Sequence, residues 1–290
     1  MLHVRRVMAI CVLFPGMMLA AAPVFGQADF SGAWGARYHE DQPERIPGPA
    51  LVDFLGLPIN DAARQFALSW DPLRLGLLEH QCQVHTAAYI YRGPLQLRIW
   101  EERDPDSQQL VAIRQRISTY EQERTIWMDG RPHPSANAPH TWMGFSTGEW
   151  NGSMLTVTTT HIKQGWHRRN GLPSGDRITL REHYVRHGDQ LVHINIVQDP
   201  DYLTEPLIKT QNFVLTTTGT GNWLWPCEYV VESADREQGE VPHYLPGENE
   251  FREDFARRHG LPVDAALGGA RTMYPEYQKE LSDWYKNGGR

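Results

Sequence analysis

The chain is rich in histidine, the side chain best suited to proton transfer near neutral pH and a common metal ligand. It has 13 histidines among 290 residues. Their spacing matches no standard motif, because the sequence contains no H-E-x-x-H, C-x-x-C or G-x-S-x-G pattern and no phosphate-binding loop. The histidines therefore suggest acid–base or metal chemistry without specifying a reaction.

Two of these histidines are expected to face each other across a β-hairpin. The hairpin turns at His187-Gly188-Asp189, between two stretches of alternating polar and apolar residues. This loop places His183 opposite His193, with Cβ atoms roughly 5 Å apart. Arg181 and Asn195 form the next facing pair. The polar strip so formed would lie either in solvent or in a polar cavity inside a barrel.

The facing pair could carry either proton transfer or metal chemistry. Two imidazoles at this distance can share a proton or a divalent metal ion such as zinc or copper. Zinc needs three or four protein ligands, and His161 and Glu182 are the candidates for the others. We therefore interpret His183, His193 and His161 as candidate catalytic residues, with Arg181 steadying negative charge. The first two are alternatively metal ligands.

The opposite face of this hairpin is predicted to form part of the core. One carboxylate, Glu182, interrupts an otherwise apolar stripe. The stripe consists of Leu180, Tyr184, Val192, Ile194 and Ile196.

A rigid turn is expected between Trp127 and Pro134, where an Asp-Gly pair is followed by two prolines. A rigid loop presents side chains in fixed positions, so Asp129 and His133 could act in catalysis and Arg131 could orient a substrate. The alternative is structural, with the aspartate capping its own turn and the arginine pairing with a carboxylate.

Aromatic and basic side chains supply the candidate ligand contacts. Tyr202 could form a rim in the proline-bounded loop 199–206. Lys163 could bind an acidic group together with Arg168 and Arg169, although a solvated charge cluster is the alternative. Asn195 of the hairpin is a further candidate ligand contact. The tryptophans that could stack on a ligand, rather than fill a core, are Trp142, Trp150 and Trp166.

The charge balance disfavours nucleic acid as a partner. The chain has 28 lysines and arginines against 35 aspartates and glutamates, a net charge of −7 at neutral pH. Nucleic-acid binding requires clustered cations, and here the basic residues are scattered.

Residues 1–26 have the composition of a cleavable signal peptide. Arg5 and Arg6 precede an uncharged apolar run that extends to Gly26, the expected cleavage site. The break at Pro15 argues against a membrane anchor, which needs roughly 20 uninterrupted apolar residues. We therefore expect a periplasmic or secreted protein without a membrane span.

Two cysteines remain once Cys11 is removed with that segment. An even count in an oxidising compartment favours a disulfide between Cys82 and Cys227. A thiolate metal site or nucleophile is the alternative.

Short alternating stretches predict nine or ten β-strands joined mostly by short turns. Asn151-Gly152 marks a hairpin whose predicted register places Ser146 opposite Val157. A further pair is expected from residues 207–215 and 225–232. Strands in series favour an antiparallel β-barrel of calycin or lipocalin type, or a β-sandwich, with short helices at the N- and C-terminal ends.

The expected organisation is one β domain with terminal extensions. Residues 27–80 form a turn-rich arm and a helix capped by Asn60, and residues 81–232 form the antiparallel β domain. Residues 233–290 form a C-terminal extension with short helices packed on the same domain.

Several blocks of sequence resemble a large group of exported bacterial proteins of unknown function. The blocks are D-F-S-G-A-W (29–34), I-W-M-D-G-R-P-H-P (126–134), T-W-M-G-F-S-T-G-E-W (141–150), T-T-H-I-K-Q-G-W-H-R-R-N-G (159–171) and D-P-D-Y-L-T-E-P (199–206). Phe145 stands where many members have histidine. The resemblance covers essentially the whole chain after residue 26. It implies export, a single domain and pairing of Cys82 with Cys227, but no reaction.

The sequence thus predicts an exported enzyme that uses histidine acid–base chemistry in a β-barrel cavity. Its substrate is expected to be a small apolar or aromatic molecule, and lyase, isomerase and hydrolase chemistry all fit. One alternative is a calycin-like protein that binds an apolar ligand without turnover. The other is a metal-binding protein that uses the facing histidines.

Overall fold

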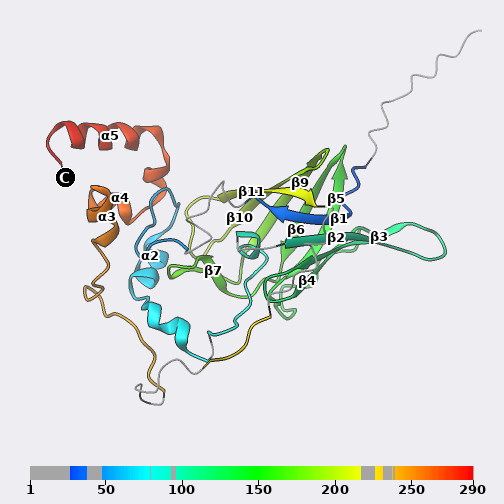
Figure 1. Cartoon of the computed structure of the whole chain (residues 1–290), viewed down its shortest axis with the longest axis horizontal. Coiled ribbons are helices and arrows are strands. Elements are labelled where there is room, and N and C mark those ends of the chain that lie inside the picture. Colours follow the sequence, from blue (N-terminus) through cyan, green and yellow to red (C-terminus); the bar gives the residue numbers. More distant parts are fainter. Residues whose placement is uncertain are drawn as a thin grey trace, which may run out of the picture.

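The computed structural model describes residues 27–37, 48–78, 80–92, 96–216, 226–230, 237 and 239–289. In this part of the chain, nine strands form a closed barrel in the order β1-β11-β10-β9-β6-β5-β4-β3-β2 (Figure 1). All neighbours are antiparallel except β4 and β5, which pair in parallel. The barrel predicted from the sequence is therefore confirmed, and the sandwich is excluded.

The barrel strands are β1 (Gly32–Ala36), β2 (Gln96–Arg103), β3 (Leu110–Ile117), β4 (Gln122–Trp127), β5 (Phe145–Asn151), β6 (Met154–Thr160), β9 (Thr179–His187), β10 (Gln190–Gln198) and β11 (Leu207–Thr216). A separate two-stranded sheet consists of β7 (Gly165–Arg168) and β8 (Leu172–Ser174). Among the described residues, the α-helices are α2 (Asp61–Leu68), α3 (Asp254–His259), α4 (Val263–Ala266) and α5 (Pro275–Lys286), and three short 3₁₀ helices span Pro72–Gly76, Ile90–Arg92 and Ala270–Met273.

The segment expected to be a surface arm instead supplies β1, the strand that closes the barrel. β1 pairs with β2 on one side and with β11 on the other. Its central side chain, Trp34, is fully buried inside the barrel. The high glycine and proline content around this short strand concealed it, because those residues usually indicate turns.

The third strand pair predicted from the sequence is wrong in part. β11 forms as expected, but residues 226–230 are not a strand, and β11 pairs with β1 and β10. The expected turn at 219–222 and the signal peptide at 1–26 lie outside the described residues.

The register of the β5–β6 hairpin differs from the prediction by two residues, so Ser146 pairs with Thr159 and not with Val157. The loop consists of Gly152 and Ser153, and the glycine at its first position has a φ of 62°. Because side chains alternate with a period of two, an even shift leaves every residue on its predicted face. Leu155, Val157 and Thr159 are accordingly buried.

The register of the β9–β10 hairpin differs by one residue, which has the opposite consequence. Its loop is Gly188-Asp189, so His193 pairs with Tyr184 and His183 pairs with Ile194. A shift of one residue moves a strand's side chains to the other face. The prediction that His183 faces His193 is therefore wrong, as is the prediction that Val192, Ile194 and Ile196 face the core.

The barrel interior has three tiers. One apolar cluster contains Tyr184, Leu191 and Phe213, and a second contains Leu180, Val197 and Leu207. Polar residues lie between the two clusters on the same strands. Along each of β9, β10 and β11, the inward-facing side chains therefore change from apolar to polar and back to apolar. We call the middle tier the polar layer; its members are Tyr91, Gln115, Arg124, Ser146, Thr159, Glu182, His193, Asn195 and Gln211.

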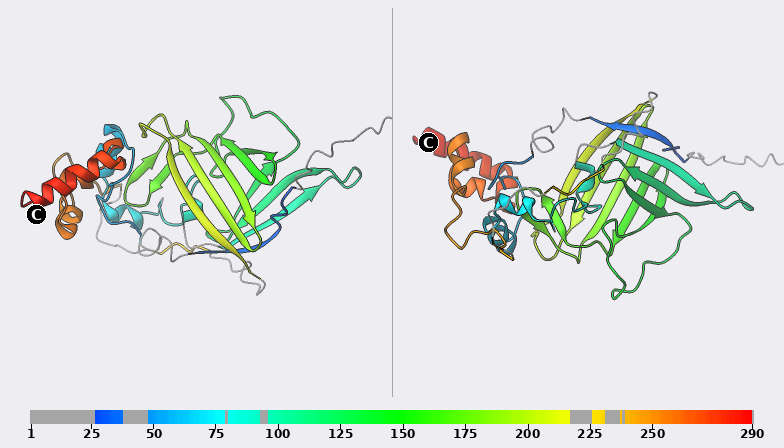
Figure 2. Two further views of the ribbon diagram at one scale, coloured as in Figure 1. Left: turned by 90° about the horizontal axis from the view of Figure 1, so that it is seen from above. Right: turned by 60° about the horizontal axis from the view of Figure 1, so that its bottom comes forward.

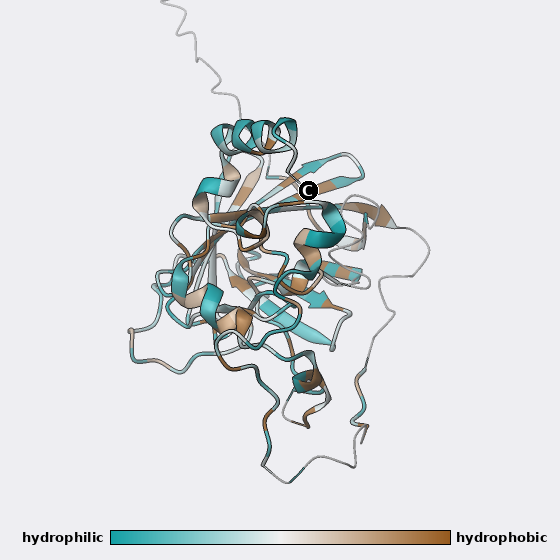
Figure 3. Cartoon of the chain, turned by 90° about the vertical axis from the view of Figure 1, so that its left-hand side faces the viewer, coloured by the Kyte–Doolittle hydropathy of each residue, from teal (hydrophilic) through white to brown (hydrophobic). Residues whose placement is uncertain are grey.

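Helices gather at one end of the barrel, away from the β2–β3 hairpin (Figure 2). The Asn60 side chain caps α2 by accepting a hydrogen bond from the backbone N–H of Ala63 at 2.9 Å, as predicted. Seen from this end, α5 is mostly hydrophilic (Figure 3), and it buries only Tyr277 and Leu281. Among the described residues, none of the helices is both long and apolar enough to cross a membrane.

The predicted disulfide between Cys82 and Cys227 is confirmed. It joins the segment that precedes the 3₁₀ helix Ile90–Arg92 to the segment that follows β11. Disulfides persist where the environment is oxidising. The bond therefore fits a protein located outside the cytosol.

Candidate functional site

The polar layer is built around an ion pair between Arg124 on β4 and Glu182 on β9. The two side chains are 1% and 0% exposed. One guanidinium nitrogen of Arg124 donates to Glu182 Oε1 at 2.9 Å, and the other donates to Oε2. The pair is bidentate, the geometry in which a buried arginine best compensates a carboxylate.

The remaining hydrogen-bonding capacity of Arg124 is used by hydroxyl groups. It donates to Tyr91 Oη at 2.9 Å, to Thr159 Oγ1 at 2.7 Å and to Ser146 Oγ at 3.1 Å. The Tyr91 hydroxyl in turn donates to Gln115 Oε1. A buried charge is tolerated only when its hydrogen bonds are satisfied, and these partners satisfy Arg124.

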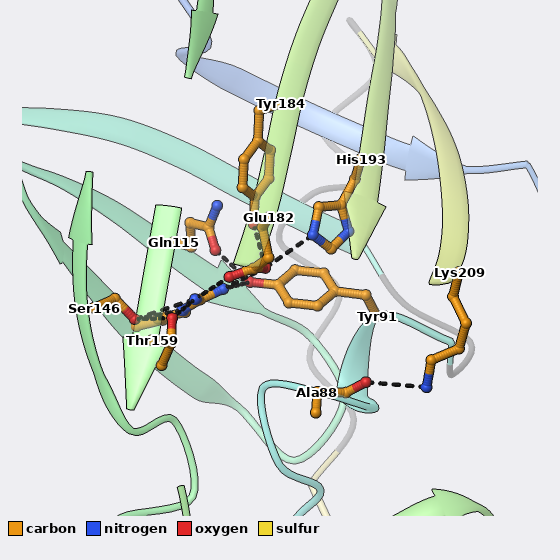
Figure 4. A network of polar contacts seen from close by, with 10 residues as sticks. Ala88, Tyr91, Gln115, Ser146, Thr159, Glu182, Tyr184, His193 and Lys209 are labelled. Carbon is orange, nitrogen blue, oxygen red and sulfur yellow. Dashed lines mark hydrogen bonds and ion pairs between the residues drawn. The ribbon is translucent and has the colours of Figure 1, made fainter. Parts of the chain in front are cut away.

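Glu182 also accepts two hydrogen bonds from its own strand and the neighbouring strand β10. The Tyr184 hydroxyl donates to Oε1 at 3.1 Å, and His193 Nε2 lies 2.8 Å from the same oxygen (Figure 4). The rings of Tyr184 and His193 stack with centroids 4.6 Å apart, because these residues are direct cross-strand partners.

Electrostatics keep Glu182 ionised. Burial by itself would raise its pKa, but the charge and hydrogen bonds of Arg124, together with the His193 hydrogen bond, lower the pKa from 4.5 to about 2. Burial also raises the pKa of both Tyr91 and Tyr184, so the two phenols remain protonated donors. The layer thus contains an ionised pair and two neutral phenol groups.

This arrangement determines the tautomer of His193. An ionised carboxylate can only accept, so Nε2 must carry the proton that it shares with Glu182. In the neutral ring Nδ1 then holds a lone pair. Nδ1 is buried and has no hydrogen-bond partner within the described part of the chain.

A narrow pocket lies beside His193. Its volume is about 10 Å³, roughly what one water molecule needs. Two further buried atoms that border it, Asn195 Oδ1 and Gln211 Oε1, likewise find no partner among the described residues. Lys209 Nζ donates to the carbonyl of Ala88 at 3.2 Å (Figure 4). The pocket is lined by Ala88, Tyr91, Arg92, His193, Asn195, Lys209, Thr210 and Gln211.

A second buried pair of the same type lies where β10 ends. His167 Nε2 is 2.7 Å from Asp199 Oδ2, and both side chains are fully buried. Asp199 also accepts backbone hydrogen bonds from Gly175 at 2.9 Å and Asp201 at 3.0 Å. Burial lowers the pKa of His167 more than the adjacent carboxylate raises it.

His183 and Arg181, predicted with His193 to form one strip, lie on the outer face of β9. His183 Nδ1 is 3.1 Å from Thr156 Oγ1, and Arg181 is exposed. His183 and His193 are thus on opposite faces of the barrel wall and cannot bind one metal ion. No group of three or more potential metal ligands occurs among the described residues.

The two other predicted histidines lie together outside the barrel. His133 Nδ1 and His161 Nδ1 are 2.8 Å and 2.7 Å from the same hydroxyl, Thr160 Oγ1. Asp129 forms an ion pair with Arg131, whose guanidinium lies over the Trp127 ring. The structure therefore shows the turn-stabilising arrangement for Asp129 and Arg131.

None of the predicted aromatic contacts borders the pocket. Trp150 stacks on Phe30 at 5.5 Å, and Trp166 packs edge-on against Trp70 at 4.6 Å. Trp142 lies beneath the Lys163 ammonium group, whereas Tyr202 packs against the second apolar cluster. Of the ligand-binding candidates, only Asn195 is brought next to His193.

Sequence reasoning missed Arg124 and Tyr91, and it considered Glu182 only as a metal ligand. A signal was present, because Glu182 interrupts an apolar stripe and a buried carboxylate requires a cation. Arg124 stands at a core-facing position of β4, between Gln122 and Ile126. Pairing these two interruptions would have suggested the ion pair.

Comparison of the chain with known protein families, with curated proteins and with solved structures finds no match to any of them. The resemblance to exported bacterial proteins stays an expectation, and the candidate site rests on its own geometry.

Proposed function

We propose that the protein is an acid–base enzyme in which His193 removes a proton from a small polar molecule. The observation that carries this proposal is the different surroundings of the two nitrogens of the His193 ring. Nε2 is bound to an ionised carboxylate, whereas Nδ1 is buried, unpaired within the described structure and adjacent to a pocket. A base oriented by a carboxylate and open on its other nitrogen is the arrangement that general base catalysis requires.

The chemistry follows from the two ring nitrogens. Nδ1 takes a proton from an O–H group or an activated C–H group, and the electron pair of the broken bond stays on the substrate. The resulting imidazolium keeps its Nε2–H bond to Glu182, whose negative charge stabilises it. Proton return from Nδ1 to product or solvent restores the neutral ring.

The rest of the polar layer acts on His193 through Glu182. Arg124 holds the carboxylate ionised and in place, and Tyr184 fixes the imidazole plane by stacking. These are positioning residues, because neither lines the pocket. Tyr91, Asn195, Gln211 and Lys209 do line it and are the candidates for substrate contact.

The filled barrel interior disfavours a large apolar ligand inside it. Trp34, Tyr184 and Phe213 occupy the lumen on one side of the polar layer. Polar side chains line the pocket, Asn195, Gln211 and Lys209 among them, and for this reason we propose a polar substrate in place of the apolar or aromatic one expected from the sequence. Binding of a ligand without turnover remains the alternative function.

A first test measures the protonation state of His193 directly. Nitrogen-15 NMR should show the proton on Nε2 and a bare Nδ1, and His183→Gln should leave these signals unchanged. A ring protonated on both nitrogens would contradict the proposal, because it could not accept a proton.

A second test looks for turnover in a panel of small polar molecules in D2O, followed by proton NMR. His193→Gln should reduce any conversion or solvent-deuterium incorporation by about 10²- to 10⁴-fold. His183→Gln, a matched change on the outer face of the neighbouring strand, should leave the rate unaltered. Conversion that survives His193→Gln would exclude His193 as the base.

We also propose export to the periplasm or the exterior, followed by removal of residues 1–26. The Cys82–Cys227 bond supports this proposal. Mass spectrometry of the protein isolated from its native cell fraction should find Gln27 at the N-terminus.

A further inference from the structure

The segment 129–140, between β4 and β5, lies on the outside of the barrel with few apolar contacts. None of its side chains is buried, and none belongs to the apolar clusters of the described core. The ion pair between Asp129 and Arg131 and the backbone hydrogen bond from Ala138 to Ser135 are internal to the segment. Polar contacts with the barrel therefore decide whether the segment stays in place.

Histidine rings make the hydrogen bonds that join this segment to the barrel. His133 Nδ1 is 2.8 Å from Thr160 Oγ1 on β6, and His133 Nε2 is 2.9 Å from Thr147 Oγ1 on β5. His161, which follows β6, reaches back to the segment, with Nε2 2.8 Å from the carbonyl oxygen of Ser135. Its Nδ1 is 2.7 Å from Thr160 Oγ1, so the two rings share one hydroxyl group.

A third ring completes the attachment. His140 Nδ1 is 3.0 Å from the carbonyl oxygen of Ile162, and its ring centroid lies 5.3 Å from that of His161. In the described structure, no other hydrogen bond joins residues 129–140 to the rest of the protein. The attachment thus depends on the one type of side chain that titrates near neutral pH.

The contacts of His133 and His161 form one donor–acceptor chain only when both rings are neutral. A carbonyl oxygen only accepts, so His161 Nε2 carries the proton and Nδ1 accepts the hydroxyl proton of Thr160. That hydroxyl has no second proton, so it accepts from His133 Nδ1, and His133 Nε2 accepts from the Thr147 hydroxyl. A proton added to either ring makes an accepting nitrogen a donor that faces an O–H donor. Protons on both rings would place two cations on one hydroxyl group.

The surroundings of the two rings also affect their protonation. Burial, together with the nearby His161, lowers the pKa of His133 below the usual 6.5. The other titratable and charged groups around the rings carry charges of both signs. They are His140, Asp129 and Arg131 of the segment, Glu149 on β5, Lys163 after β6, and Arg181 and His183 on β9.

We propose that residues 129–140 form a flap that acid releases from the barrel wall. Once the flap is released, the rings of His133 and His161 can take up protons that the attached arrangement disfavours. Below about pH 6.5, the ratio of released to attached flap rises by up to about tenfold per pH unit for each proton taken up. Release uncovers the outer face of β5 and β6 at Thr147 and Thr160. Neither ring lines the pocket beside His193, so this switch is separate from the proposed base.

The experiment measures backbone nitrogen-15 order parameters in the full mature protein at about pH 7.5 and about pH 5. The amides of residues 129–140 should have order parameters of about 0.85 at the higher pH and below about 0.6 at the lower pH. The amides of β5 and β6 should stay ordered at both, which shows that the barrel remains folded. An ordered flap at both pH values, or a mobile one at both, would overturn the inference.

Variants separate the histidine contacts from a general effect of acid. Thr160→Val removes the hydroxyl that both rings share at nearly constant shape, so it should release the flap at about pH 7.5 already. His133→Gln offers an amide to both hydroxyls but does not titrate, so the loss of order on acidification should be smaller. His183→Gln is the matched control, because His183 contacts Thr156 outside the flap, and it should respond to pH as the wild type does.

Thermal unfolding of each variant verifies that it is folded, and His133→Gln decides the question if Thr160→Val is not. A wild-type pH response in His133→Gln, or a flap that stays attached in Thr160→Val, would reject the assigned contacts. Loss of the pH response in His183→Gln would do the same, because the response would then arise outside the flap.

Discussion

The pairs Glu182–His193 and Asp199–His167 use the same two groups in different surroundings. In each, a buried carboxylate meets an imidazole Nε2, at 2.8 Å and 2.7 Å respectively. Glu182 is compensated by the charge of Arg124, whereas Asp199 is held by His167 and two backbone N–H groups. The Glu182–His193 pair lies inside the barrel, where Glu182 also forms an ion pair with Arg124. The Asp199–His167 pair joins β7 and the end of β8 to the end of β10.

The difference separates a candidate site from a structural contact. His193 lines a pocket together with buried polar atoms that have no partner among the described residues, so its second nitrogen borders open space. The Asp199 carboxylate instead connects three backbone segments through His167, Gly175 and Asp201. Nδ1 of both imidazoles is buried and has no partner among the described residues, so a histidine–carboxylate pair by itself does not identify a catalytic site. The pocket beside His193 is the observation that distinguishes it.

The largest effect is expected from Arg124→Met. It leaves the Glu182 carboxylate buried without its cation, which costs about 3–5 kcal/mol of unfolding free energy. Urea denaturation measures the loss. The double variant Arg124→Met with Glu182→Met should recover most of it, because no buried charge is left. A loss below about 1 kcal/mol in the single variant would show that solvent reaches Glu182.

Acid should destabilise the protein through Glu182 in a defined pH range. Its pKa is about 2 in the folded state and 4.5 when unfolded, so the unfolded chain binds the proton first. The stabilisation is complete above pH 4.5 and is lost as pH falls through about 2, with a total of about 3 kcal/mol. Urea midpoints across this range should fall less steeply in the Arg124→Met, Glu182→Met double variant. Parallel curves would contradict the assignment.

Asp199→Asn should have a smaller effect than Arg124→Met. The variant loses a charge-assisted hydrogen bond to His167 and directs an amide group at backbone donors, but it leaves no uncompensated cation nearby. A loss of about 1–3 kcal/mol follows. Turnover measured on the folded variant should be unchanged. A specific loss of turnover would place Asp199 in the functional site.

The smallest effect is expected from the titration of His167. Burial lowers its folded pKa below the usual 6.5, so on acidification the unfolded chain takes up the proton first. Its contribution is therefore present above pH 6.5 and declines as pH falls below that value. His85, His133 and His183 have lowered pKa values too, so the comparison is between wild type and His167→Gln. The variant should show a shallower decline between pH 6.5 and pH 5, and an unchanged slope would contradict the prediction.

Local patterns allowed several elements to be predicted. Alternation of polar and apolar residues identified β2, β3, β6, β9 and β10, and Asn60 identified the start of α2. The pairing of Cys82 with Cys227 followed from their number. The prediction of which side chains of β5 and β6 face the barrel interior was correct even though the predicted register was not. The register was wrong by an even number of residues, which leaves each side chain on the same face.

The candidate site could be predicted only in fragments. His193 and Asn195 were identified on β10, but the one-residue register error at Gly188-Asp189 assigned them the wrong neighbours. Which of two adjacent residues begins a hairpin loop depends on small differences in backbone energy. That choice decides which side chains face the lumen.

The sequence by itself determined that this protein is mainly β and built from antiparallel hairpins, and it favoured a disulfide, since periodicity, turn residues and cysteine number are local properties. Barrels and sandwiches use the same hairpins, so the structure decided between them. Only the tertiary structure decided that Arg124 meets Glu182, 58 residues away on a strand that is not its neighbour. Closure of the sheet by β1 brings β4 and β9 across one lumen, where a buried carboxylate must find a cation. The identity of that cation depends on the curvature and register of the whole barrel, which no local pattern contains.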